Sequence, residues 1–120
     1  MNKILLTGLA ISRRVDYDEK GEAKGKHVAI YADAREVAPF GRRLGANMMM
    51  SEAMLEQVKM NETLFNSWVD AESKHIVKGF ALKGSQLGLE VNVPDMLMPL
   101  REQLANGLKR FCENDMPWYH

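Results

Sequence analysis

The segment KHVAIYADAR, residues 26–35, alternates apolar and polar side chains with a period of two. Its apolar positions are Val28, Ile30, Ala32 and Ala34, and its polar positions are His27, Tyr31, Asp33 and Arg35. Successive side chains of a β-strand point to opposite faces of a sheet. The pattern therefore predicts a strand that is buried on one face only.

An apolar segment, residues 2–17, precedes this strand and is separated from it by a polar, glycine-punctuated stretch at 18–25. The two segments predict a β-hairpin. Apolar residues occupy both parities of the first strand: Leu5, Leu9, Ile11 and Val15 on one, Ile4, Leu6 and Ala10 on the other. We expect the first half of this strand to be covered on both faces.

Two helical segments are predicted after the hairpin. Val37, Phe40 and Leu44 have helical spacing and indicate a short helix. Ser51 is a good N-cap, and residues 51–68 consist mainly of strong helix formers. Residues 75–82 fit a helix by their apolar spacing and a strand by Gly79 and the β-branched pair Ile76 and Val77.

A second hairpin and a last helix complete the prediction. Residues 83–86 read as a turn, and Leu87, Leu89, Val91 and Val93 alternate with polar residues as in a strand. Pro99 is expected in the first turn of the last helix. The apolar stripe of that helix is Leu97, Leu100, Leu104, Leu108 and Phe111.

These elements predict an α+β fold for a single domain, residues 1–120. Antiparallel β-hairpins in the order β-β-α-β-β-α form one sheet, with two or three amphipathic helices packed on one face. A chain of 120 residues is about one domain long.

Composition narrows the setting of the protein. Cys112 is the single cysteine, so no internal disulfide is possible, and a lone thiol is typical of a reducing compartment. No run approaches the roughly 20 apolar residues of a membrane helix. The sequence thus predicts a cytoplasmic protein without membrane contact. Residues 1–45 have nine basic and six acidic residues, whereas the remainder has seven and ten, a polarity that favours a charged partner or self-association.

No catalytic, metal-binding or cofactor-binding motif is predicted. Glu72 and His75 have the spacing that places both on one helix face, but a carboxylate-bridged metal site needs two such pairs. His75 is therefore interpreted as a surface histidine. Cys112 lies at the C-terminal end of a helix, where the dipole does not activate a thiol, and is interpreted as a small buried hydrophobe.

The leading functional hypothesis is a non-enzymatic binding or regulatory protein that acts through protein contacts. Methionine adapts to irregular surfaces and is frequent at binding sites. Three consecutive methionines, Met48, Met49 and Met50, cannot all face one core, so at least one is expected to be exposed. Trp118 and Tyr119 are expected to fold back onto the core or to dock on a partner. The predicted partner is another protein or a second copy in a homodimer.

A single-stranded nucleic-acid-binding module is the second hypothesis. The start Asn2-Lys3-Ile4-Leu5-Leu6-Thr7-Gly8, leading into a long hairpin, resembles the first strands of bacterial single-stranded DNA-binding proteins. The likeness covers these seven residues and the hairpin, with Tyr17 and Tyr31 as its aromatics, while most of the remaining chain reads as helical. The candidate phosphate contacts are Arg13, Arg14, Lys24, Lys26, Arg42 and Arg43.

A small enzyme is the third hypothesis. Its site would assemble from His27, Asp33, Arg35 and His75, which requires these four groups to converge in one pocket.

Overall fold

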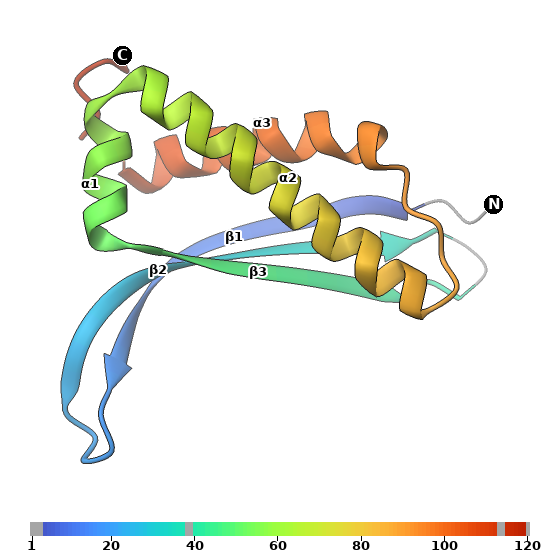
Figure 1. Cartoon of the computed structure of the whole chain (residues 1–120), viewed down its shortest axis with the longest axis horizontal. Coiled ribbons are helices and arrows are strands. Elements are labelled where there is room, and N and C mark those ends of the chain that lie inside the picture. Colours follow the sequence, from blue (N-terminus) through green and yellow to red (C-terminus); the bar gives the residue numbers. More distant parts are fainter. Residues whose placement is uncertain (1–3, 38–39, 113–114, 120) are drawn as a thin grey trace.

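The computed structural model describes residues 4–37, 40–112 and 115–119 (Figure 1). Asn2 and Lys3, which belong to the predicted first strand, lie outside the described residues. Three antiparallel strands form one sheet in the order β1-β2-β3, with bounds Ile4–Tyr17, Ala23–Glu36 and Arg43–Ser51. Three helices follow: α1 (Glu52–Met60), α2 (Glu62–Gln86) and α3 (Val93–Cys112). The predicted α+β class and the first hairpin are confirmed, while the predicted element order is wrong.

The helices lie on one face of the sheet and leave the other face open (Figure 1). Val28, Ile30, Ala32 and Ala34 of β2 are fully buried beneath them. The intervening residues of β2 point to the opposite face, where Tyr31 and Arg35 are exposed. The alternation of residues 26–35 therefore predicted both the strand and its buried face correctly.

A β-bulge at Thr7 explains why β1 is apolar on both parities. Leu6 pairs with Ala34 and Gly8 pairs with Asp33, so Thr7 is one extra residue. The side chains that face the helices are even-numbered before the bulge and odd-numbered after it, so Ile4, Leu6, Leu9 and Ile11 all pack against one core. The expected coverage of both faces is wrong, and Leu5 is exposed on the open face.

The short helix predicted around residues 37–44 is also wrong, because Arg43–Ser51 is strand β3. It pairs with β2 from Arg43 opposite Arg35 to Ser51 opposite His27. Leu44, Ala46 and Met50 point toward the helices and are buried. The strand was not predicted because glycine, alanine and methionine take the places of the β-branched and aromatic residues that are typical of strands.

Asn61 divides the predicted helix 51–68 in two. Ser51 caps α1 as expected, since its Oγ accepts a hydrogen bond from the backbone N of Met54 at 3.0 Å. Asn61 has extended backbone angles, and its side chain caps α2 by accepting from the backbone N of Leu64 at 3.0 Å. Helix α2 then runs 25 residues and includes the ambiguous segment 75–82.

The strand predicted over residues 87–93 is instead an irregular loop at 87–92 followed by the first residue of α3. The turn predicted at 83–86 is the last turn of α2. Gly88, two residues beyond the end of this helix, has a φ of +73° and terminates it. Leu89 and Val91 pack against this helix end: a Cβ added at Gly84 would lie 2.9 Å from Val91 Cγ2. Their alternation therefore reflects packing against Gly84 and not a sheet.

Helix α3 starts earlier than predicted. Its first residue is Val93, so Pro99 lies inside the helix and not in its first turn. The Asn92 side chain accepts from the backbone N of Asp95 at 3.3 Å and satisfies one of the first amides. Met96, Leu100, Leu104, Leu108 and Cys112 form the buried stripe, whereas Leu97 and Phe111 are half-buried.

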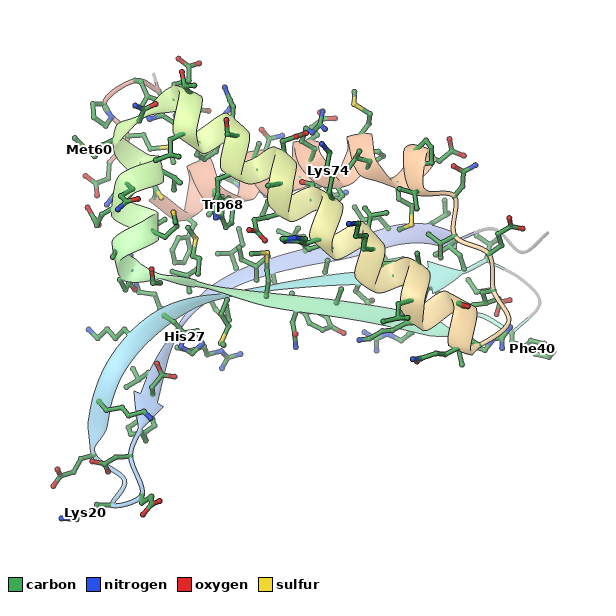
Figure 2. All side chains as sticks on the ribbon, viewed as in Figure 1. Lys20, His27, Phe40, Met60, Trp68 and Lys74 are labelled. Atoms are coloured by element: carbon green, nitrogen blue, oxygen red, sulfur yellow. The ribbon has the colours of Figure 1, made fainter. Side chains whose placement is uncertain are left out.

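The end of the β1–β2 hairpin projects beyond the rest of the molecule (Figure 1). Strand β3 pairs with β2 only as far as His27, so residues 15–26 form a two-stranded ribbon with its turn. We call residues 15–26 the arm. It bends away from the helices, toward the side of the open face, with Lys20 at its tip (Figure 2).

Candidate binding surface on the open face of the sheet

The open face is the sheet surface opposite the helices. Strand alternation and the bulge place there Leu5, Gly8, Ala10, Ser12 and Arg14 of β1, His27, Ala29, Tyr31, Asp33 and Arg35 of β2, and Arg43, Gly45, Asn47, Met49 and Ser51 of β3. Small side chains predominate at the centre of this surface, so it is shallow around its one aromatic residue.

That aromatic residue, Tyr31, leans across the sheet onto Gly45. Tyr31 is paired with Asn47, so Gly45 is its diagonal neighbour on β3. A Cβ added at Gly45 would lie 2.5 Å from Tyr31 Oη and 3.1 Å from its Cζ. The ring thus occupies space that exists only because residue 45 has no side chain, and Tyr31 is still 43% exposed.

The uncompensated charge on the open face is positive. Asp33 is covered by its neighbours: Thr7 Oγ1 donates to its Oδ2 at 3.0 Å, and Arg43 Nη2 donates to the same oxygen at 3.2 Å. Asp16, at the root of the arm, contacts His27 Nδ1 at 3.0 Å. Arg14 and Arg35 form no ion pair with any carboxylate of the described residues.

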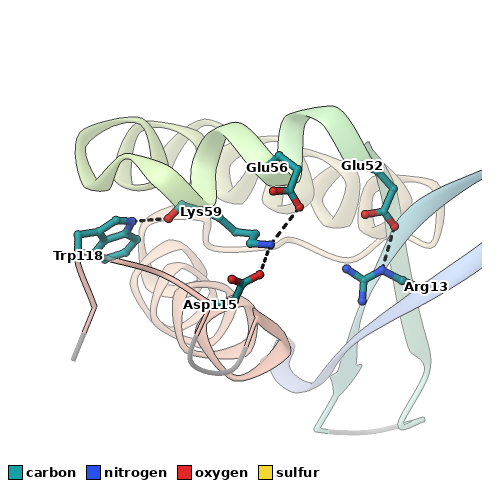
Figure 3. A network of polar contacts seen from close by, with 6 residues as sticks. All are labelled: Arg13, Glu52, Glu56, Lys59, Asp115 and Trp118. Atoms are coloured by element: carbon teal, nitrogen blue, oxygen red, sulfur yellow. Dashed lines mark hydrogen bonds and ion pairs between the residues drawn. The ribbon is translucent and has the colours of Figure 1, made fainter.

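The structure divides the predicted phosphate contacts into three groups. Arg14 and Arg43 lie on the open face, whereas Lys24 and Lys26 belong to the arm. Arg13 faces the helices: its Nε lies 2.9 Å from Glu52 Oε1, and its guanidinium lies 4.8 Å from the ring centre of Phe111 (Figure 3). This arginine therefore joins β1 to α1 and α3.

Arg42 holds the turn between β2 and β3. Its Nε donates to Glu36 Oε1 at 3.0 Å, and its Nη1 donates to the carbonyl of Leu87 at 3.0 Å. Glu36 has no exposed surface. The hydrogen bond from Arg42 lowers the pKa of Glu36 and outweighs the opposing effect of its burial. Arg42 is consequently a structural residue.

The described methionines are divided between the core and the surface. Met50, Met96 and Met116 are buried, and Met48 and Met54 pack against the core from half-buried positions. Met49 meets the expectation that one of the three is exposed, at 70%, on the open face. Met60 on α1 and Met98 on α3 are also exposed, at 62% and 67%, so contact of methionines with a protein partner stays a prediction.

The C-terminal segment folds back onto the helices, as one of the two expectations had it. Trp118 Nε1 donates to the carbonyl of Lys59 at 2.8 Å (Figure 3). The Trp118 ring centre also lies 5.0 Å from that of Phe65. Lys59 is itself buried between Asp115 and Glu56, whose hydrogen bonds raise its pKa, that to Asp115 most. Tyr119 is 44% exposed on this layer.

The residues of the enzyme hypothesis do not converge. His27 lies at the root of the arm on the open face, while His75 belongs to α2 and is exposed beside Glu72, at 3.2 Å (Figure 2). The sheet separates the two histidines. Among residues 4–37, 40–112 and 115–119, no group of three His, Cys, Asp or Glu side chains is placed to hold a metal ion. Cys112 is buried, which raises the pKa of its thiol.

A groove of about 600 Å³ lies between α2 and α3 on the helical layer. Its lining holds two acidic and two basic side chains, Asp70 and Glu102 against Arg101 and Lys109, and Asp70 pairs with Arg101. It therefore offers no field of one sign to a ligand. Within the part of the chain that the structure describes, no helix is long and apolar enough to cross a membrane.

Comparison of the chain with protein-family models, with curated proteins and with solved structures finds no match. The candidate surface is therefore identified from its geometry alone. Its main residues, Tyr31 and Arg35, were both predicted on the polar face of β2. Sequence reasoning did not connect them with Arg43, because β3 was not predicted.

Proposed function

We propose that the protein binds single-stranded nucleic acid on the open face, with Tyr31 stacking against a base, Arg35 supplying the unpaired positive charge for a phosphate, and Arg43, which pairs with Asp33, bordering the same site. The placement of Tyr31 over Gly45 is the observation on which the proposal depends. Base–aromatic stacking combined with nearby positive charge is the common basis of binding to single strands, and it tolerates any sequence.

The arrangement of the surface favours an unpaired strand. Arg35 and Arg43 are opposite each other across β2 and β3. Tyr31 lies four residues along β2, at about 13 Å for a strand rise near 3.3 Å per residue. In a duplex the base faces are stacked inside the helix and are not available to Tyr31, so the site should discriminate against double strands.

The surroundings of Tyr31 also support the proposal. Ala10 is its partner on β1, and Ala29 precedes it by two on β2, so the ring has small neighbours on these two sides. Met49 is exposed on the same face and offers an apolar contact for a second base. The arm bends toward this side of the sheet and borders the space above the face (Figure 1).

Fluorescence anisotropy of a labelled oligothymidylate tests the proposal, with a duplex of equal length as competitor. Tyr31→Ala should weaken binding by roughly 5- to 150-fold, since stacking contributes about 1–3 kcal/mol per base. Tyr31→Phe should retain binding because it keeps the ring. Tyr119→Ala is the matched control, since Tyr119 is equally exposed on the other layer. Absence of binding at low salt, or equal binding by the Tyr31→Ala variant, overturns the proposal.

The arginines are tested by salt dependence. Each phosphate contact to a single strand contributes about −0.7 to the slope of log affinity against log salt concentration. Arg35→Gln should therefore make the slope shallower by about 0.7. Lys78→Gln on α2 is the control, since Lys78 is exposed on the helical layer and should leave the slope unchanged.

A further inference from the structure

Strand β1 is an edge strand, and its outer edge is open along the arm. Among residues 4–37, 40–112 and 115–119, the sheet order β1-β2-β3 leaves one side of β1 without a neighbouring strand. Along residues 15–17 the strand belongs to a ribbon of only two strands. A two-stranded ribbon is marginally stable in water, and an unpaired edge is a template for another strand.

The side chains at the root of the arm alternate in chemistry. Val15 and Tyr17 are 39% and 62% exposed, and they lie two residues apart, on one face of the strand, where both expose apolar atoms. Between and beside them, on the other parity, lie Asp16 and Arg14. Arg14 has no carboxylate partner among the described residues, and 41% of the Asp16 side chain is accessible although it contacts His27.

We propose that two copies of the protein pair antiparallel along their β1 edges, with the two-fold axis at Val15. Such an interface is isologous, so each contact occurs twice. Val15 then lies opposite the partner's Val15, and Arg14 lies opposite the partner's Asp16. The two arms form one four-stranded sheet, in which both arginines and both aspartates find a partner of opposite charge.

The charges select this register over its neighbours. Moving the two-fold axis by one residue toward the N-terminus places Arg14 opposite the partner's Arg14. Moving it by one residue toward the C-terminus places Asp16 opposite the partner's Asp16. Like charges directly opposite each other destabilise a strand pair, whereas opposite charges stabilise it. Placing the axis between two residues instead would pair side chains that point to different faces.

The acidic turn of the arm fits the same arrangement. Beyond Tyr17 the chain turns through residues 18–22, which hold three carboxylates, Asp18, Glu19 and Glu22, against one lysine, Lys20. In the proposed pair this turn approaches the end of the partner's body, where the partner's Arg110 borders a hollow of about 280 Å³ between β1 and α3. The turn is negative and the hollow has a basic rim, so the second contact is also complementary in charge.

Charge exchange tests the pairing on the full chain by sedimentation velocity and native mass spectrometry. Arg14→Asp alone and Asp16→Arg alone each place like charges opposite each other twice, and each should weaken the dimer by at least about tenfold. The double variant R14D/D16R should restore it. An equimolar mixture of the two single variants should form a heterodimer, because one chain then presents only carboxylates and the other only arginines.

His27→Gln is the control, because it removes the contact of His27 with Asp16 while keeping the pair between Arg14 and the partner's Asp16. This variant should still dimerise. A wild-type protein that stays monomeric, or single variants that dimerise as well as the wild type, overturns the pairing. Failure of both the double variant and the mixture to dimerise overturns it as well. None of these readouts depends on nucleic acid, so the pairing is tested separately from the proposed function.

Discussion

The two faces of strand β2 share one backbone but differ in the burial and the polarity of their side chains. On the covered face Val28, Ile30, Ala32 and Ala34 have no exposed surface. On the open face the neighbouring positions Tyr31 and Arg35 are exposed and polar. One strand thus supplies both the core of the fold and the candidate binding surface. Since side chains alternate strictly, substitutions at adjacent positions should separate stability from binding.

The largest contrast is expected between Ile30→Ala and Tyr31→Ala. Ile30 is fully buried, and removing most of its side chain should lower the free energy of unfolding by about 2–5 kcal/mol. Tyr31 loses only half-exposed contacts, so its truncation should cost about 1 kcal/mol or less. Urea unfolding followed by circular dichroism measures both.

Binding should show the reverse order. The folded fraction of the Ile30→Ala variant should keep the affinity of the wild type for oligothymidylate, because its open face is intact. The comparison fails if Tyr31→Ala destabilises the protein as much as Ile30→Ala does, since Tyr31 would then be a core residue.

The two faces also differ in what their carboxylates do. Glu36 is buried on the covered face, and Arg42 holds its pKa below the ordinary value by donating a hydrogen bond to it. A lowered pKa in the folded state means that the pair stabilises the protein above the ordinary glutamate range. This stability is lost as the pH falls through the lowered pKa.

Glu36→Gln should therefore lower the melting temperature at neutral pH and flatten its decrease in acid. Asp33→Asn, the same chemical change on the open face, should have a smaller effect because Asp33 is held by Thr7 and Arg43 at the surface. Melting curves between neutral and acidic pH measure both variants. Equal effects of the two substitutions would show that the covered face gives Glu36 no special role.

The sequence predicted strand β2 correctly but failed for strand β3 and for residues 87–93. The alternation of residues 26–35 was enough to place both faces of β2, because one strong local pattern determined it. Strand β3 was missed because its residues become a strand only by pairing with β2, a contact distant in sequence. The prediction of a strand at 87–93 was wrong because a local pattern was present without a partner strand: Leu89 and Val91 alternate because they pack against Gly84 at a helix end.

The candidate site was predictable only in part. Arg14 and Arg43 were selected by charge, but charge alone did not distinguish these open-face arginines from Arg13 and Arg42, which point away from that face and are bound to Glu52 and Glu36. Those ion pairs depend on tertiary contacts with α1 and with the turn after β2. The relation of Tyr31 to Gly45 required the register of β3, so no local pattern indicated it.

The sharpest test of the open face is Gly45→Ala, for which only a small change in stability is expected. The new methyl group would lie 2.5 Å from Tyr31 Oη, so the ring has to leave its place on β3. Because the obstacle is the end of a side chain that can rotate into solvent, the free energy of unfolding should fall by only about 1 kcal/mol. The affinity for oligothymidylate should fall nearly as far as in Tyr31→Ala.

Gly8→Ala provides the matched control for this prediction. Gly8 lies on the same face, and no atom lies within 4 Å of a Cβ added there. This variant should match the wild type in both urea unfolding and anisotropy. The two substitutions add the same methyl group to the same face and differ only in their effect on the ring of Tyr31. If Gly45→Ala binds as tightly as Gly8→Ala, the nucleic acid does not recognise the position of Tyr31 over β3.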